Sequence, residues 1–272
     1  MTLDGAAYAA LARQIAQTSG FALEAYKDKC IRRRIAVRMR ACGVHTYDDY
    51  RALLDRTPNE YERLRDALTI NVTRFFRNAE TWNLLRRDVL PLLLDPRRAQ
   101  LRAWSAGCAS GEEPYTLAML AAGLLDGAGW GDRLAQVSID ATDIDRASLE
   151  RARAASYRPD ALAEMPEELA GSYFEAHGPG RRVVERIRRR VHVQRLDLSR
   201  DPPLRSDYDL IICRNVVIYF DRPMQERLFG VFAETLAPGG YLVLGKVETL
   251  FGPARDSFAL VDPRERVYRR RA

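Results

Sequence analysis

From about Leu101 onward, short runs of apolar and β-branched residues alternate with helical segments, and no other feature of the chain constrains its fold as strongly. This alternation is typical of an α/β fold with an open, doubly wound sheet, in which helices connect parallel strands. The predicted strands are 101–105, 135–142, 191–194, 208–213 and 241–244. Two further runs, 258–261 and 266–269, flank the turn sequence Asp262-Pro263-Arg264-Glu265 and predict a terminal antiparallel hairpin.

The sequence before this sheet predicts a small all-helical domain. Helical periodicity runs from Gly5 to about Leu68 with short breaks and without a convincing strand. A linking helix follows over Thr81–Leu94, and Asp95-Pro96 ends it, because the residue before a proline disfavours the helical conformation. We therefore divide the chain into a helical domain, 1–72, a linker, 73–97, and an α/β domain, 98–272.

One stretch of the α/β domain does not fit the wound-sheet pattern. Residues 171–190 hold Gly178-Pro179-Gly180 between two short runs that can form strands. This arrangement predicts a small inserted β-subdomain.

Composition excludes several classes of protein. The chain has 272 residues, 47% of them hydrophobic, which is enough for one large domain with a small companion. No stretch approaches the roughly 18 apolar residues of a membrane span, and the first residues lack the pattern of a signal peptide, so we expect a cytoplasmic protein without membrane insertion. Four scattered cysteines and three histidines support neither a disulfide framework nor a metal site.

The strongest chemical signal follows the first predicted strand. Residues 106–115, Ala-Gly-Cys-Ala-Ser-Gly-Glu-Glu-Pro-Tyr, join small residues to two carboxylates at the start of a helix. Such a loop lies at the carboxyl edge of the sheet, where small residues let a cofactor approach the backbone. It has neither GxGxxG nor a Walker lysine, and its carboxylates would repel a phosphate. A cationic, phosphate-free ligand such as a sulfonium nucleoside fits better, although an ordinary turn capped by Ser110 would look similar.

Acidic residues also follow the second predicted strand, at Asp143-Ile144-Asp145. An acid at the tip of this strand can accept hydrogen bonds from both ribose hydroxyls of a nucleoside. Asp143 is the candidate for that contact. Asp145 is better placed to cap the helix that begins at Arg146.

A polar loop follows the buried strand 208–213. It contains Asn215 and, a few residues later, Tyr219. In a sheet wound in this way the loop after the fourth strand faces the cofactor, so both residues are expected to line the reaction centre. The later sequence Pro238-Gly239-Gly240 predicts a tight, mainly structural turn before the next strand.

Four motifs occur in order along nearly the whole chain, namely Asn71-Val72-Thr73-Arg74-Phe75-Phe76-Arg77 and the segments 104–115, 143–145 and 213–220. Together they resemble the chemotaxis receptor methyltransferases, which are CheR-type protein-glutamate O-methyltransferases. The resemblance implies a Rossmann-like class I methyltransferase fold that binds S-adenosyl-L-methionine and releases S-adenosyl-L-homocysteine. It also implies that the methyl acceptors are glutamate side chains of methyl-accepting chemotaxis receptors.

The resemblance further implies which residues hold the cofactor. Glu113 would bind the amino group of the methionine part, and Asp143 the ribose. Two positions depart from the family pattern: Asp197 replaces a common asparagine near the adenine, and Gly245-Lys246-Val247-Glu248 replaces the commoner Gly-His-Ser-Glu. The implied set is Asn71, Thr73, Arg77, Glu113, Asp143, Asp197, Leu198, Asn215 and Val216.

Methyl transfer from a sulfonium to a carboxylate oxygen is an in-line displacement, and a carboxylate is already ionised at neutral pH. No general base is obligatory, so the task of the enzyme is to place the reacting atoms. Arg77 and Tyr219 are the predicted catalytic residues, because they can position the acceptor carboxylate.

Residues 26–40 hold seven basic residues and one acidic one, a local charge equal to the +6 of the whole chain. In a helix, Ile31, Ile35 and Met39 form an apolar stripe, with Lys27, Arg34 and Arg38 on one flank and Lys29, Arg33 and Arg40 on the other. Such a run is often only a solvated face, and its charge would also suit nucleic acid. The resemblance instead implies docking on the acidic cytoplasmic helical bundle of a chemoreceptor, with Lys27, Arg33, Arg34, Arg38 and Arg40 as substrate-binding residues.

Two other functions stay open from the sequence. A nucleic-acid methyltransferase acting on amino groups needs Asp/Asn-Pro-Pro-aromatic after the fourth strand, whereas Asp201-Pro202-Pro203-Leu204 precedes that strand and lacks the aromatic residue. We therefore expect no nucleic-acid partner. A non-catalytic, cofactor-sensing adaptor is the other alternative. The compact, arginine-rich insertion favours receptor contact without a C-terminal tether peptide, and composition gives no sign of an oligomer, so we expect a monomer.

Overall fold

A computed structural model describes residues 3–19, 21–69 and 72–272. The chain divides into two compact units, one made of Met1–Ile70 with Tyr219–Gln225 and the other of Asn71–Ile218 with Glu226–Ala272. The first unit therefore includes a short segment that follows the fourth predicted strand of the sheet, and Tyr219 is part of it.

The first unit is helical, as predicted. Its helices are α1 (Leu3–Ser19), α2 (Asp28–Ala41), α3 (Tyr47–Arg56) and α4 (Pro58–Leu68), with a 3-10 turn at Leu23–Ala25. Thr46 caps α3 by accepting a hydrogen bond from the Asp49 amide at 3.1 Å. The apolar stripe of α2, Ile31, Ile35 and Met39, is buried, which confirms the predicted orientation of this helix in its own unit.

The segment Tyr219–Gln225 joins this helical unit through its backbone. The Lys27 amide donates to the Tyr219 carbonyl at 2.9 Å, and the Asp221 amide donates to the Ala25 carbonyl at 3.0 Å. The rings of Tyr26 and Phe220 lie 4.8 Å apart. These contacts explain why the segment clusters with the helices rather than with the sheet that precedes it.

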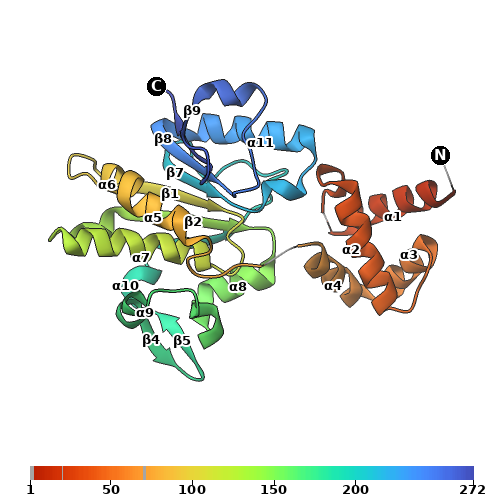
Figure 1. The fold of residues 1–272 in the computed structure, drawn as a ribbon. Coiled ribbons are helices and arrows are strands. Elements are labelled where there is room, and N and C mark those ends of the chain that lie inside the picture. The colour runs from red at the N-terminus through yellow and green to blue at the C-terminus, as the bar shows by residue number, and fades with distance from the viewer. Residues whose placement is uncertain (1–2, 20, 70–71) are drawn as a thin grey trace. The chain divides into compact units, whose positions relative to one another are not determined.

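The second unit is built on a seven-stranded sheet with the order β6-β2-β1-β7-β8-β10-β9 (Figure 1). The strands from β6 to β8 run parallel, and β9 and β10 form the predicted antiparallel hairpin at one edge. The strands are β1 (Leu101–Ala106), β2 (Val137–Asp143), β6 (Val191–Arg195), β7 (Tyr208–Cys213), β8 (Leu236–Leu244), β9 (Phe258–Asp262) and β10 (Val267–Arg270). Because the chain order reverses at β1, the carboxyl ends of β1 and β7 form the point where this type of sheet binds ligands.

Helices cover both faces of the sheet. Figure 1 shows α7 (Glu112–Gly127) and α11 (Arg222–Thr235) on opposite sides, with α8 (Arg146–Ala154) beside β2 and β6. The predicted linking helix is present as α5 (Ala79–Leu84), a π turn at Leu85–Val89 and α6 (Leu90–Leu93). The wide turn precedes Pro91, which has no amide to donate and whose ring would clash with a regular helical carbonyl. None of the helices in the described part of the chain is long and apolar enough to span a membrane.

Three strands begin elsewhere than predicted, although β10 differs by a single residue, since it starts at Val267 rather than Arg266. β2 starts at Val137 rather than Ala135, because Gly131–Gln136 forms a 3-10 turn. β8 starts at Leu236 rather than Tyr241, and the predicted turn at Pro238-Gly239-Gly240 is a bulge inside this strand. Tyr208 pairs with Leu236 while Leu210 pairs with Tyr241, and Gly239 has a φ of +77° that accommodates the extra residues.

The predicted β-subdomain is present and begins earlier in the chain. It is a three-stranded antiparallel sheet of β3 (Ser156–Tyr157), β5 (Gly180–Val183) and β4 (Phe174–His177), accompanied by α9 (Glu167–Tyr173) and α10 (Glu185–Arg188). The strand β3 lies before the predicted range 171–190. The sequence could not predict this strand, because two residues are too few to give a periodic signal. Tyr157 and Phe174 pack against Phe75, which fixes the subdomain to the sheet unit.

Candidate active site

The loop after β1 is tied to the end of β2. The amides of Gly107 and Cys108 both donate to the Thr142 carbonyl, at 2.8 and 2.9 Å. A Cβ atom at Gly107 would lie 2.4 Å from Cγ2 of Val216, so the loop after β7 packs directly on this glycine. The predicted positions after β1, β2 and β7 are therefore brought together at the carboxyl edge of the sheet.

Gly107→Ala is expected to destabilise this unit, because it adds a steric clash to the strain of a φ of +86°. We expect a loss of roughly 2 to 4 kcal/mol, or a melting temperature lower by about 5 to 15 °C. Gly178→Ala is the matched control, since its φ of +55° carries the backbone strain but no atom lies within 4 Å of its added Cβ. Equal melting temperatures for the two variants in calorimetry would contradict the packing of Val216 on Gly107.

Glu113 lies in the first turn of α7, and its side chain is 14% exposed. The Ser105 hydroxyl at the end of β1 donates to Oε1 at 2.8 Å, and Nη1 of Arg214 lies 3.7 Å from Oε2. Burial raises the pKa of this carboxyl, while the nearby Arg214 cation opposes the shift. The neighbouring Glu112 instead accepts hydrogen bonds from the Ser110 hydroxyl, at 2.8 and 3.0 Å. Glu113 is therefore the more exposed acid of this pair.

Asp143 ends β2 and organises the adjoining loop. Oδ2 accepts from the Ala109 amide and Oδ1 from the Asp145 amide, both at 2.9 Å. Each oxygen keeps a lone pair for a further donor such as a ribose hydroxyl. Burial raises the pKa of Asp143, and the two amides oppose that shift. Asp145 caps α8 by accepting from the amides of Ala147 and Ser148, as predicted.

Asn215 has a left-handed φ of +61°, and Glu248 holds its loop in place. Oε2 of Glu248 accepts from the amides of Asn215 at 2.9 Å and Gly245 at 2.6 Å, and Oε1 accepts from the amide of Ile218 at 3.1 Å. Oδ1 of Asn215 is buried and has no hydrogen-bond partner among the described residues. A buried amide oxygen without a donor is expected to receive one from a ligand.

The segment around Arg77 carries two strained residues. Phe76 and Asn78, on either side of Arg77, have φ values of +56° and +61°. Nη1 of Arg77 donates to the Val72 carbonyl at 2.7 Å, and the Trp82 indole donates to the Arg77 carbonyl at 3.1 Å. With Ala109 and Asn215, four non-glycine residues with positive φ flank these loops, a clustering that is common at functional sites.

The remaining predicted residues lie at several different places. Thr73 is half-buried and forms a hydrogen bond with Glu112, which lowers the raised pKa of that acid. Asp197 is buried, and its Oδ1 accepts from the amide and hydroxyl of Ser199 at 2.9 and 2.6 Å, while Leu198 is half-buried. Tyr219 lies in the helical unit, under the guanidinium of Arg34 at 5.5 Å. Asn71 lies outside the described residues.

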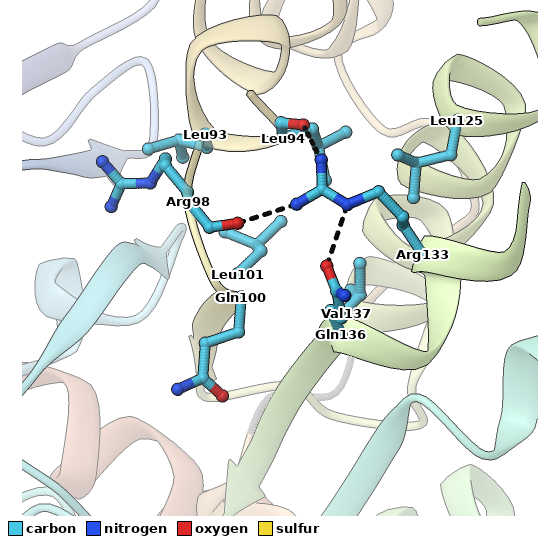
Figure 2. Close-up of a pocket in the computed structure, with 9 residues that line it drawn as sticks. All are labelled: Leu93, Leu94, Arg98, Gln100, Leu101, Leu125, Arg133, Gln136 and Val137. Carbon is cyan, nitrogen blue, oxygen red and sulfur yellow. Dashed lines mark hydrogen bonds between the residues drawn. The ribbon is translucent and has the colours of Figure 1, made fainter. Parts of the chain in front are cut away.

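A separate crevice lies at the opposite edge of the sheet, where β1 and β2 begin at Leu101 and Val137 (Figure 2). Arg133 spans it and donates to the carbonyl of Arg98 at 2.7 Å and to Oε1 of Gln136 at 2.9 Å. Its guanidinium is thus used to hold the chain together at the amino edge. The crevice contains no carboxylate, and we assign the ligand site to the carboxyl edge.

Comparison with known proteins decides the family. The CheR methyltransferase SAM binding domain matches residues 71–267, and the CheR methyltransferase all-alpha domain matches residues 6–69. The chain belongs to the CheR methyltransferase family. Chemotaxis protein methyltransferases are similar to it in Klebsiella aerogenes (33% identity over 95% of this chain and 88% of that protein), Listeria monocytogenes (34%, 91% and 91%) and Pseudomonas aeruginosa (36%, 86% and 86%).

Membership of the CheR family confirms the predicted fold and cofactor: this is an S-adenosylmethionine-dependent methyltransferase. The donor set at the carboxyl edge fits that cofactor, because Glu113 and Asp143 offer carboxylates to a cationic, phosphate-free ligand and Asn215 offers an unpaired amide oxygen. When bound, S-adenosylmethionine supplies an activated methyl group.

Three residues that hold this CheR site together were missed from the sequence. Ser105 donates a hydrogen bond to Glu113, and Arg214 lies between Glu113 and the Arg77 segment. Glu248 accepts hydrogen bonds that hold the Asn215 loop in place. The sequence offered a signal for two of them: Ser105 stands near the end of β1, and Arg214 stands beside Asn215. Glu248 lay in a segment whose departure from the family pattern left its role open, and only its contacts reveal that role.

Proposed function

We propose that the chain transfers the methyl group of S-adenosyl-L-methionine to glutamate carboxylates in the helical bundle of chemotaxis receptors. The products are glutamate methyl esters and S-adenosyl-L-homocysteine. The names of the relatives support a chemotaxis role, and the observation that carries the proposal is the exposed basic face of α2. A row of cations suits a surface of acidic helices, which is where acceptor glutamates would be found.

Arg32 pairs with Asp28 at 2.6 Å, and the other basic residues of α2 and its N-cap separate into two groups. Arg38 donates to both carboxylate oxygens of buried Glu60, at 2.9 and 2.7 Å, and Tyr50 donates to Oε1 of the same acid at 2.9 Å. Arg34 is half-buried and donates to the carbonyls of Ala67 and Leu68 at the end of α4. The exposed basic residues are Lys27, Lys29, Arg33 and Arg40. We therefore assign docking mainly to the exposed group, and to Arg34 and Arg38 a role in shaping the helix.

Reversing the exposed charges, with Arg33→Glu and Arg40→Glu together, is expected to raise the KM for a receptor fragment roughly tenfold or more at low salt. The effect should shrink as salt is added, because exposed charges are screened, and the donor Kd should not change. Arg38→Ala is the contrasting variant: it leaves Glu60 buried without its cation and should lower the melting temperature instead. If the double reversal left the KM unchanged, α2 would not be part of the docking surface.

At the reaction centre we assign Arg77 and Tyr219 to the placement of the acceptor carboxylate. The nucleophile is already ionised, so the groups need only orient it and limit its contact with water. Nη1 of Arg77 is held by the Val72 carbonyl, which fixes the guanidinium while leaving other N–H groups for the acceptor. Arg77→Ala and Tyr219→Phe are each expected to lower kcat; if both left turnover and donor affinity unchanged, this assignment would be wrong.

The proposal is tested by incubating the protein with radiolabelled donor and purified receptor fragments. Label on the fragment that mild alkali releases as volatile methanol is expected, because carboxyl esters hydrolyse under conditions in which N-methyl groups persist. Stable label, or label transferred to nucleic acid, would contradict it. The family match does not favour a nucleic-acid methyltransferase, and Asp201-Pro202-Pro203-Leu204 lies before β7, with Oδ2 of Asp201 bonded to the Asp197 amide. A binding-only adaptor would give no label at all.

A further inference from the structure

Arg214 is a buried cation at the junction of three segments. Its side chain is 3% exposed. Nη2 donates to the Arg77 carbonyl at 2.8 Å and to Oδ1 of Asn78 at 2.9 Å, while the guanidinium lies 5.4 Å from the ring of Trp82. Nη1 lies 3.7 Å from Oε2 of Glu113. The residue thus connects the loop after β7 with the Arg77 segment and with the start of α7.

The surroundings of Glu113 make this contact electrostatically important. Burial raises the pKa of Glu113, and the Arg214 cation is the largest influence that lowers it, followed by the Ser105 hydroxyl. Arg77 also lowers this pKa, whereas the Glu248 carboxylate raises it. Cys108 and Cys213 are also titratable neighbours; both are buried and have raised pKa values, so they stay neutral. Arg214 is therefore the main counter-ion of a carboxylate that burial would otherwise tend to protonate.

We propose that Arg214 is a positioning residue that keeps Glu113 ionised and aimed at the amino group of the bound cofactor, while fixing the backbone of the Arg77 segment. The proposal rests on the proposed role of Glu113. One side chain would then connect the two ends of the reaction centre. The Arg214 guanidinium lies beside Glu113, the proposed ligand of the donor, and it also donates to the backbone of the Arg77 segment.

Calorimetric binding of S-adenosyl-L-homocysteine between about pH 6 and about pH 8 separates this role from a packing role. In the wild type, affinity should vary little over this range. Arg214→Met replaces the guanidinium side chain with an apolar side chain of similar length. In this variant Glu113 loses its counter-ion, so the pKa of Glu113 rises. Affinity should then fall as pH falls, by as much as about tenfold per unit of pH below the raised pKa, because protonated Glu113 cannot pair with the ligand amino group.

Five further proteins complete the test, and one of them is the single variant Glu113→Gln. Arg214→Lys keeps the charge but cannot make both hydrogen bonds to the Arg77 segment, so it should lower affinity equally at every pH. Arg214→Gln is a second neutral variant and should show the same pH dependence as Arg214→Met, which keeps the test valid if the methionine variant does not fold. Glu113→Gln combined with Arg214→Met should lose the pH dependence. Arg264→Met, at an exposed arginine, should behave as the wild type.

The outcomes distinguish this inference from the role of Glu113. If Glu113→Gln weakens binding but the neutral Arg214 variants weaken it equally at every pH, Arg214 serves packing alone and the inference is overturned. Wild-type affinity in the neutral variants would overturn it as well. If Glu113→Gln binds as the wild type does, the proposed role of Glu113 fails first, and the inference fails with it.

Discussion

Glu113→Gln is expected to weaken the binding of both S-adenosylmethionine and S-adenosylhomocysteine by roughly 10- to 100-fold, the loss of about 1.5 to 3 kcal/mol that accompanies removal of a charged hydrogen bond. Glutamine keeps the shape and one carbonyl oxygen, so the hydrogen bond from Ser105 can persist while the charge is removed. Calorimetric titration of the purified variant measures the effect directly.

Glu234→Gln, at an exposed glutamate of α11, is the matched control and should bind as the wild type does. Both ligands share the amino group but differ in the charge on sulfur. A similar loss for the two would therefore assign Glu113 to the amino group, and a loss confined to the methylated donor would assign it to the sulfonium. Unchanged affinity for both would contradict the site as described.

Glu248→Ala is expected to have a large effect on stability. It removes the acceptor of three backbone amides, those of Asn215, Ile218 and Gly245, in a place where the carboxylate is only 3% exposed. Each buried amide left without an acceptor costs about 1 kcal/mol or more, so we expect a loss of roughly 3 kcal/mol and a melting temperature lower by about 6 to 12 °C.

The control for this prediction is Glu234→Ala, which should leave the melting temperature within about 2 °C of the wild type, as is usual for an exposed position. The left-handed conformation of Asn215 depends on the same hydrogen bonds, so Glu248→Ala should also weaken donor binding. A variant that melts and binds like the wild type would show that the Asn215 loop is held by other contacts.

Much of the fold could be predicted from the sequence, because short runs rich in apolar and β-branched residues alternate with helical segments. β7 is an example: all six residues from Tyr208 to Cys213 are buried, and the last four, from Leu210 to Cys213, form a continuous apolar run in the sequence. The bulge in β8 could not be predicted, because Pro238-Gly239-Gly240 is equally suited to a turn between elements. β3 could not be predicted, because its two residues form a strand only by pairing with β5.

The candidate site could be predicted in part. Asp143 ends β2 and Glu113 lies at the start of the helix that follows β1, and the carboxyl edge of a wound sheet is where ligands bind, so position along the chain was sufficient. The contacts of Arg38 could not be predicted, since its partner Glu60 belongs to another helix and a helical wheel shows only local neighbours. The same holds for Glu248 and Arg214, whose roles come from segments distant in the sequence.

In the proposed reaction, the methyl group goes to glutamate carboxylates of a receptor helical bundle. Tandem mass spectrometry of a purified receptor fragment, after reaction with the protein and S-adenosylmethionine, tests it most directly. We expect a mass gain of one methylene on glutamate side chains, no gain when those glutamates are changed to alanine, and a much smaller gain when Glu113→Gln replaces the wild-type enzyme at low donor concentration. A methyl group on lysine, arginine or the chain termini, or a fragment that stays unmodified while the donor is consumed, would contradict it.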